Sequence, residues 1–212
     1  MSEGRARQGL VVLTACGNAE HALRGILGRH ESLGIRAVAA EFHVHPERDP
    51  GVFLRAHDFL RTFRNTHAHA LVLLDREGSG REWQQTREEM EAAMEDRLAH
   101  SGWTDGDFAA VVTDPELDVW VWSDSPHVDE VLGWAGRRPD LRSWLRSPPR
   151  CFLTEASPKP ARPKEALQAA LREARKPRSS AMYRQLASKV SLDRCTDPAF
   201  VKLRDVLRRW FS

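Results

Sequence analysis

The stretch Gly9-Leu10-Val11-Val12-Leu13-Thr14 is a continuous apolar run that ends at the small and polar residues Ala15-Cys16-Gly17-Asn18. Such a run is typical of a strand that is buried on both faces of a parallel sheet. An apolar stripe with helical spacing follows, in which Asn18 is the expected N-cap. Its members are Ala19, Ala22, Leu23, Ile26 and Leu27. The beginning of the chain therefore predicts a buried strand followed by a helix.

The same alternation of strand and helix continues along the chain. Further strands are expected over residues 35–44, 69–74 and 108–112, and helices between them over about 50–63 and 86–98. Residues 117–122 alternate in part and are a candidate fifth strand. Thr86 and Glu89 have the spacing of a capping box. Three dipeptides place an N-cap residue before a proline and predict helix starts, namely Asp49-Pro50, Ser125-Pro126 and Asp197-Pro198.

This order of elements is typical of an α/β fold with a mostly parallel, Rossmann-like sheet flanked by helices. We expect the α/β core over residues 8–147 and a proline-rich connector over 148–163. A basic helical tail is expected over 164–212. Its apolar stripes need a surface to bury against, so we expect the tail to pack on the core.

Composition narrows the class of protein. Of the 212 residues, 41% are hydrophobic and 29% are charged, which excludes a wholly disordered or collagen-like chain. The longest apolar runs, such as Ala70-Leu71-Val72-Leu73-Leu74, are far shorter than the roughly 20 residues that cross a bilayer. The first residues lack the apolar stretch of a secretory signal, and three widely spaced cysteines favour reduced thiols. We expect a cytoplasmic protein with no membrane contact.

Charge is divided unevenly along the chain. Residues 1–149 carry 17 arginines against 24 acidic residues, a net charge of −7, whereas residues 150–212 carry 15 basic residues against 6 acidic ones, a net charge of +9. One interpretation is that the tail binds nucleic acid through its basic residues. The other is that the basic tail docks on the acidic core. The nucleic-acid interpretation rests on Lys164, Arg172, Arg175, Lys176, Arg178 and Arg184.

Acidic residues follow the predicted third and fourth strands. Asp75 and Glu77 stand where the third strand ends in a Gly-Ser-Gly turn, and Glu116 and Asp118 follow the fourth strand. Because the carboxyl ends of parallel strands meet at one edge of the sheet, these four side chains are expected to converge there. Mg²⁺ takes such carboxylates together with water and substrate phosphates. The alternative is that Asp75 caps the turn and Glu77 pairs with an arginine.

Taken in chain order, these motifs resemble the Toprim fold of topoisomerases, primases and OLD-type nucleases. The segments Pro115-Glu116-Leu117-Asp118-Val119-Trp120 and Pro163-Lys164-Glu165-Ala166-Leu167, with the helical stripes that contain Tyr183, Leu186, Phe200 and Leu203, resemble a group of small bacterial Toprim-like proteins. The resemblance covers about residues 8–212. Such proteins occur in antiphage defence loci, including methylation-associated defence systems.

The resemblance implies a nuclease-type site that uses Mg²⁺ or Mn²⁺. Asp75, Glu77, Glu116 and Asp118 would hold the metal, and Asp75, Glu77 and Glu20 would take part in catalysis. One departure is important. Toprim enzymes carry a glutamate at the end of the first strand as a proposed general acid/base, whereas Ala15 or Thr14 occupies that position here. The Glu20 carboxylate could point back toward this position. Alternatively, its negative charge could stabilise the N-terminus of the helix through the helix dipole.

Three hypotheses follow. The first is a Mg²⁺-dependent nuclease, or nuclease-derived component, of a bacterial antiphage defence system, with nucleic acid as partner. The second is a catalytically inactive adaptor on the same fold that binds other defence-system proteins, and the missing glutamate favours it. The third is an α/β domain that binds a small molecule. A homo-oligomer is also possible.

Overall fold

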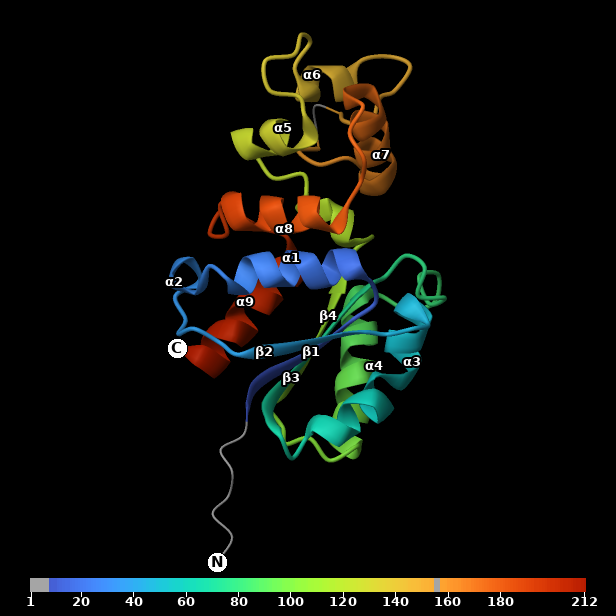
Figure 1. Ribbon diagram of the computed structural model, residues 1–212. Helices are drawn as coiled ribbons and strands as arrows, with labels where there is room; N and C mark the ends of the chain where they lie inside the picture. Colours follow the sequence, from blue (N-terminus) through green and yellow to red (C-terminus); the bar gives the residue numbers. More distant parts are fainter. Residues whose placement is uncertain (1–7, 155–156) are drawn as a thin grey trace, which may run out of the picture.

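The structure is a computed structural model that describes residues 8–154 and 157–212 (Figure 1). Its centre, within these residues, is a sheet of four parallel strands in the spatial order β2-β1-β3-β4. The strands are β1 (Gln8–Thr14), β2 (Ala40–Val44), β3 (His67–Asp75) and β4 (Phe108–Thr113). In the register, Leu10 of β1 lies opposite Ala40 on one side and His69 on the other. The predicted α/β fold with a parallel, Rossmann-like sheet is confirmed.

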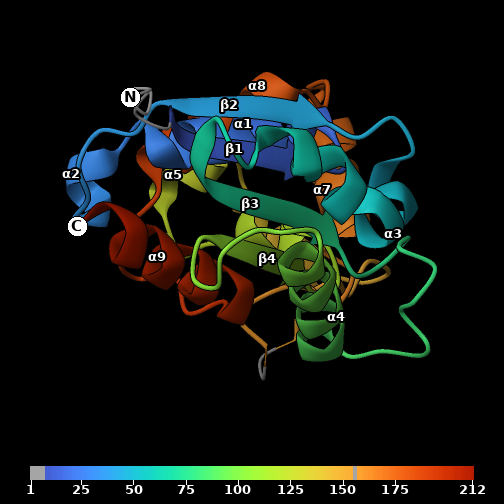
Figure 2. The ribbon, with the colours of Figure 1, turned by 90° about the horizontal axis from the view of Figure 1, so that it is seen from below.

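Alternate residues of the strands supply two separate cores, one on each face of the sheet. Leu10 and Val12 of β1 pack with α1 (Gly17–Leu27) and α9 (Pro198–Phe211). Val11 and Leu13 pack on the other face with α3 (Arg48–Leu60) and α4 (Arg87–His100). Figures 1 and 2 show α3 and α4 on the opposite side of the sheet from α9. Burial of both strand faces explains the continuous apolar run of β1.

The remaining helices extend the first of these cores. α8 (Ser180–Lys189) runs alongside α1, and α5 (Pro126–Leu132), α6 (Leu141–Arg146) and α7 (Pro163–Ala174) gather beyond it (Figure 1). The backbones of α1 and α8 approach closely at Gly25, where an added Cβ would stand 2.7 Å from the Arg184 carbonyl oxygen. The shorter elements are α2 (His30–Leu33), η1 (Arg61–Phe63) and η2 (Leu117–Trp120).

Three predicted helix starts are confirmed because each depends on local chemistry. Thr86 accepts the Glu89 N–H while Glu89 accepts the Thr86 N–H, which is a complete capping box. The side chains of Ser125 and Asp197 cap α5 and α9, each with proline at the following position. The expected tail helices are present as α7, α8 and α9.

Local predictions are wrong at the starts of α1 and β2 and over residues 117–122, where contacts with distant parts of the chain determine the structure. Helix α1 begins at Gly17, so Asn18 is not its N-cap, and the Asn18 amide oxygen accepts a hydrogen bond from the Ser180 hydroxyl at 2.8 Å. Strand β2 begins only at Ala40, since Arg36 donates its N–H to the carbonyl of Phe211 instead of to a strand. The candidate fifth strand is the 3₁₀ turn η2.

Candidate functional site

Asp75, the last residue of β3, lies at the carboxyl edge of the sheet. Its carboxylate accepts hydrogen bonds from the Thr113 hydroxyl at 2.5 Å and from the Leu117 N–H at 2.7 Å. The N–H of Asp75 donates to Oδ1 of Asp49 at 2.8 Å. The ends of β3 and β4, the turn η2 and the first turn of α3 therefore meet around this one residue.

The surroundings of Asp75 favour its protonated form. The pKa of Asp75 is raised to about 7, mainly by burial and further by the neighbouring Asp49 carboxylate, while the hydrogen bonds from Thr113 and Leu117 oppose the rise. Burial also raises the pKa of Asp49. No ion pair joins either carboxyl to a basic residue in the described parts of the chain. Two neighbouring acidic groups are costly to ionise together without a bound cation, so this arrangement favours an added cation or a proton on one of the two carboxyl groups.

Asp49 is the site residue that the sequence analysis missed. It was expected to be the N-cap of its helix, but α3 begins at Arg48 with Glu47 as the N-cap. The side chain of Asp49 is thereby free to reach across to the end of β3. The available signal was its position in the short segment between the second strand and the following helix, because that strand ends at the same edge of the sheet.

Glu77 lies close to Asp75 in sequence but does not join it. Its side chain is exposed, and its N–H donates to the carbonyl of Pro115 at 2.9 Å. The two acids of the Asp75-x-Glu77 motif therefore have different environments, and the acidic neighbour of Asp75 is the half-buried Asp49.

Glu116 is buried and paired with the start of α7. Its carboxylate accepts the Lys164 N–H at 3.0 Å and lies 3.2 Å from the Lys164 ammonium group. Burial raises the pKa of Glu116, the Asp118 charge adds to this, and Lys164 opposes it. The carboxylate that was expected to bind metal is therefore held by a residue that was expected to bind nucleic acid.

Asp118 is held in the same way by the segment that leads into α8. Nη2 of Arg178 lies 3.0 and 2.8 Å from the two carboxylate oxygens, and the Tyr183 hydroxyl donates to Oδ1 at 2.6 Å. Nε of Arg178 also donates to the Tyr183 hydroxyl oxygen at 2.7 Å. Burial and the Asp118 charge raise the pKa of Tyr183 well above its ordinary value, so its hydroxyl remains a donor.

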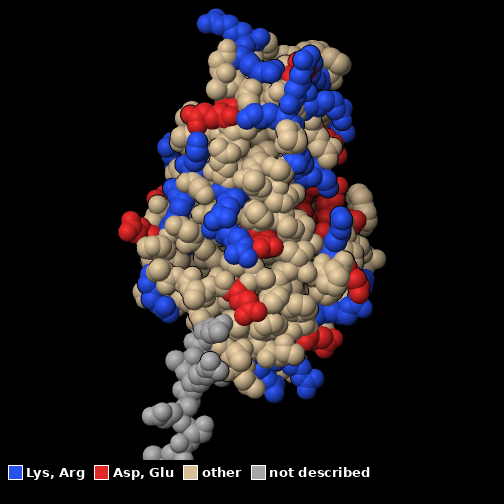
Figure 3. Space-filling model, viewed as in Figure 1, with Lys and Arg blue, Asp and Glu red and all other residues tan. Residues whose placement is uncertain are grey.

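The six tail residues assigned to nucleic acid have different positions. Lys164 and Arg178 pair with core acids, and the Lys176 ammonium group donates to the carbonyl of Val131 at 3.2 Å. Arg172, Arg175 and Arg184 are exposed. On the face drawn in Figure 3, basic side chains are prominent toward the end formed by α5, α6 and α7. Much of the tail's positive charge near the site is thus used to dock the tail on the acidic core.

The end of β1 lacks the acid that Toprim enzymes carry there. Ala15 is 2% exposed and packs in the core with α3, so a methyl group fills the slot. Glu20 lies in α1, where its carboxylate pairs with Arg24 at 2.8 Å. The structure therefore gives Glu20 a partner within its own helix and not at the sheet edge.

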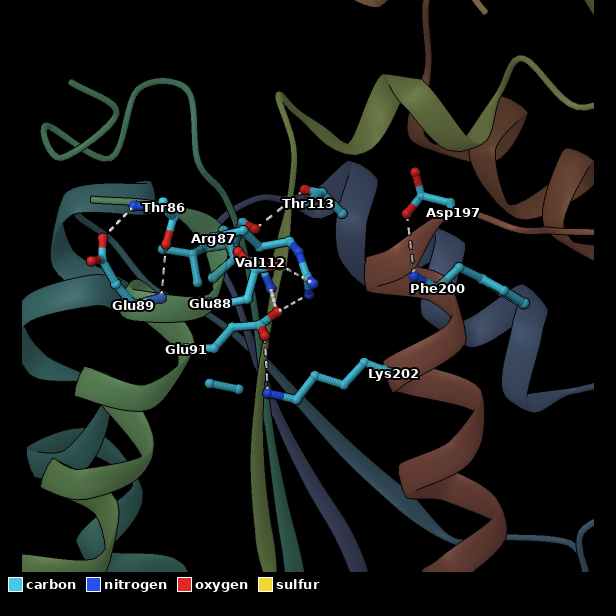
Figure 4. Close-up of polar contacts among 12 residues, drawn as sticks. Thr86, Arg87, Glu88, Glu89, Glu91, Val112, Thr113, Asp197, Phe200 and Lys202 are labelled. Atoms are coloured by element: carbon cyan, nitrogen blue, oxygen red, sulfur yellow. Dashed lines mark hydrogen bonds and ion pairs between the residues drawn. The ribbon is translucent and has the colours of Figure 1, made fainter. Parts of the chain in front are cut away.

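A second polar cluster covers the free edge of β4 (Figure 4). Alternate β4 residues bond to β3, so the N–H groups of Ala110 and Val112 face outward. They donate to Glu95 at 3.0 Å and to Glu91 at 2.9 Å, and Lys202 of α9 lies within 3.1 Å of both carboxylates. These acids therefore protect a sheet edge and are not available for chemistry.

The predicted four-carboxylate metal site does not fit this geometry. In residues 8–154 and 157–212, no group of three or more His, Cys, Asp or Glu side chains is arranged to hold a metal ion. Glu116 and Asp118 are occupied by Lys164 and Arg178, and Glu77 is exposed. Asp75 and Asp49 remain, and a pair of carboxylates is sufficient for Mg²⁺ when water and substrate phosphate complete the shell.

Comparison with protein-family models, with curated proteins and with solved structures finds no match to this chain. No helix in the described residues has the length and apolar character needed to cross a membrane. The site must therefore be interpreted from its own geometry.

Proposed function

We propose that the chain is a divalent-cation-dependent phosphodiesterase, a nuclease-type component of a bacterial antiphage defence system, with Mg²⁺ or Mn²⁺ held by Asp75 and Asp49. The observation that carries the proposal is the hydrogen bond from the Asp75 main-chain N–H to the Asp49 carboxylate, which places both acidic residues at the carboxyl edge of a parallel sheet. Ligand sites of open α/β sheets lie at that edge. A metal would supply stabilisation of the charge that develops on phosphate oxygens.

The residues around the pair have suitable roles. Thr113 and the Leu117 N–H fix the orientation of the Asp75 carboxylate through hydrogen bonds of 2.5 and 2.7 Å. Lys164 and Arg178 bring two cations to the same edge, through their pairs with Glu116 and Asp118. Burial raises the pKa of Asp49, and the charge of Lys164 is close enough to oppose part of that rise. Because both cations are already paired with buried carboxylates, their attraction for a phosphate group is reduced, and Lys164, the more exposed of the two, would contribute most of it.

The test combines metal binding with cleavage. Mn²⁺ binding is measured by calorimetry, and cleavage of plasmid and single-stranded DNA and RNA is measured in Mg²⁺, in Mn²⁺ and in EDTA. Asp75→Asn and Asp49→Asn should each weaken metal binding and cleavage by about tenfold or more, the effect of about 1.4 kcal/mol. Asp58→Asn is the matched control, because Asp58 is an exposed acid on the same helix as Asp49. No cleavage by the wild-type chain, or equal cleavage by Asp75→Asn, refutes the proposal.

A specific observation favours a second candidate, a catalytically inactive adaptor that binds other defence-system proteins. Ala15 fills the slot of the general acid/base, and Glu20 is paired with Arg24. Saturable Mn²⁺ binding that depends on Asp75, without turnover of any nucleic acid, would favour the adaptor. The positive test is a stoichiometric complex between this chain and the purified product of a neighbouring gene, measured by light scattering.

A further inference from the structure

A small cavity lies behind the carboxyl edge, between α1, η2, α8 and the start of α9. Its volume is about 50 Å³. The wall is mainly apolar and includes Ile26, Leu117, Trp120, Leu186 and Phe200. A water molecule needs about 10–15 Å³ by the same kind of measure, so the cavity has room for roughly three to five non-hydrogen atoms.

One polar group in this wall has no partner. Oγ of Ser123 is buried and makes no hydrogen bond to any described residue. The backbone of Ser123 is fully used, because its N–H donates to the carbonyl of Val121 at 2.9 Å and its own carbonyl accepts from Arg142 at 3.0 Å. A buried hydroxyl without a partner is unfavourable and needs an explanation, and an occupant of the cavity would provide one.

We propose that this cavity binds one small, mainly apolar molecule, of the size of a short aliphatic alcohol or ketone, whose single oxygen forms a hydrogen bond with Ser123. The apolar wall selects the hydrocarbon part of the ligand, and the buried Ser123 hydroxyl, which has no partner among the described residues, selects one polar group. A purely polar ligand would lose its hydration against this wall without compensation.

The cavity shares two residues with the carboxyl edge. Leu117 lines the cavity while its N–H holds Asp75, and Tyr183 lines the cavity while its hydroxyl holds Asp118. An occupant therefore touches two residues that position site carboxylates. The amide signals of Leu117 and Tyr183 report binding, whether or not the chain cleaves nucleic acid.

The test uses the full chain and two probes, n-butanol and xenon, without metal or nucleic acid. Amide NMR spectra should show saturable shifts at Leu117, Ser123 and Tyr183 with either probe. Ser123→Ala should weaken n-butanol binding about fivefold, the effect of one hydrogen bond, and leave xenon binding unchanged. Ala22→Leu, which adds volume at the cavity wall, should weaken both probes, whereas Ala92→Leu on the exposed face of α4 should weaken neither.

Shifts that increase linearly without saturation would refute the proposal. Equal n-butanol affinity in the wild type and Ser123→Ala would also refute it, because the hydroxyl would then select nothing. If Ala22→Leu fails to fold, the comparison of the two probes on Ser123→Ala still decides the outcome. Because the samples contain no Mg²⁺, Mn²⁺ or nucleic acid, the result does not depend on the proposed phosphodiesterase activity.

Discussion

The main-chain N–H of Asp75 donates a 2.8 Å hydrogen bond to Oδ1 of Asp49. This contact joins the end of β3 to the first turn of α3 and brings the Asp49 carboxylate against the backbone of Asp75, close enough for the charge of Asp49 to raise the pKa of Asp75. Burial raises the pKa of both carboxyl groups, to about 7 for Asp75. We therefore expect the protonation of Asp75 to change near neutral pH.

Asp75→Asn should change the dependence of stability on pH. The folded pKa of Asp75, about 7, lies above the value of about 3.9 in an unfolded chain. Between these values the folded state binds more protons than the unfolded state, so stability falls as pH rises, by at most about 1.4 kcal/mol per pH unit. The asparagine side chain of the variant would stay neutral at every pH. Urea unfolding in EDTA from pH 5 to pH 8 should show that the variant gains stability relative to the wild type as pH rises.

The control for this prediction is Asp58→Asn, which removes an exposed acid from α3. Its curve should run parallel to that of the wild type. A parallel curve for Asp75→Asn as well would mean that Asp75 is ionised throughout this range, contrary to the expectation.

Arg178→Met should be strongly destabilising. Arg178 is the cation bonded to the buried Asp118, and its removal leaves that carboxylate with only the Tyr183 hydroxyl. Breaking a buried pair on one side costs about 3–5 kcal/mol. Arg24→Met is the comparison, because the Arg24–Glu20 pair is more exposed and should contribute no more than about 1 kcal/mol. Urea unfolding measures both, and equal losses would contradict the importance of the Arg178 contact.

A second variant separates charge from packing at this position. Adding Asp118→Asn to Arg178→Met should restore part of the lost stability, since it removes the uncompensated buried charge. If the double variant is less stable than Arg178→Met alone, the apolar part of the Arg178 side chain explains the loss.

Glu91→Ala should expose the edge of β4. The Glu91 carboxylate accepts the Val112 N–H at 2.9 Å and pairs with both Arg87 and Lys202 (Figure 4). Its loss should cost about 1–3 kcal/mol and accelerate hydrogen exchange at Val112. Glu88→Ala, on the exposed side of the same helix, should change neither quantity. Unchanged exchange at Val112 would show that the edge is protected by other means.

Gly25→Ala should destabilise the protein, although alanine is more favourable than glycine inside a helix by about 1 kcal/mol. The new Cβ would lie 2.7 Å from the Arg184 carbonyl oxygen and 2.8 Å from Cβ of Ala187, so α1 and α8 would have to separate. Overpacking of this kind costs about 1–3 kcal/mol. At Gly17 of the same helix the nearest atom is 3.6 Å away, so Gly17→Ala should be tolerated. Thermal unfolding compares the two, and an equal or higher Tm for Gly25→Ala would contradict the close helix contact.

The elements that the sequence predicts well are those with local causes. The continuous apolar run of β1 and the capping box of Thr86 and Glu89 are both present as expected. The segment of residues 117–122 was misinterpreted because its alternation is incidental. It forms a 3₁₀ turn whose Leu117 N–H and Asp118 carboxylate are held by Asp75 and Arg178.

The candidate site was predictable in position but not in membership. The rule that parallel strands end at one edge correctly indicated where Asp75 would lie. It could not indicate that Asp49 would be the neighbour of Asp75, or that Glu116 and Asp118 would be neutralised by Lys164 and Arg178. Those partners depend on how the chain beyond residue 147 folds back on the core.

The sequence by itself determined that this protein is an α/β chain with a buried parallel sheet, because strand and helix periodicity depends only on neighbouring residues. The tertiary structure alone decided which acids stand free and which are paired. Asp49 lies 26 residues from Asp75, and Asp118 lies 60 residues from Arg178. Such distant groups meet only when the strands take the order β2-β1-β3-β4 and the C-terminal helices pack against them, and burial then sets their charges.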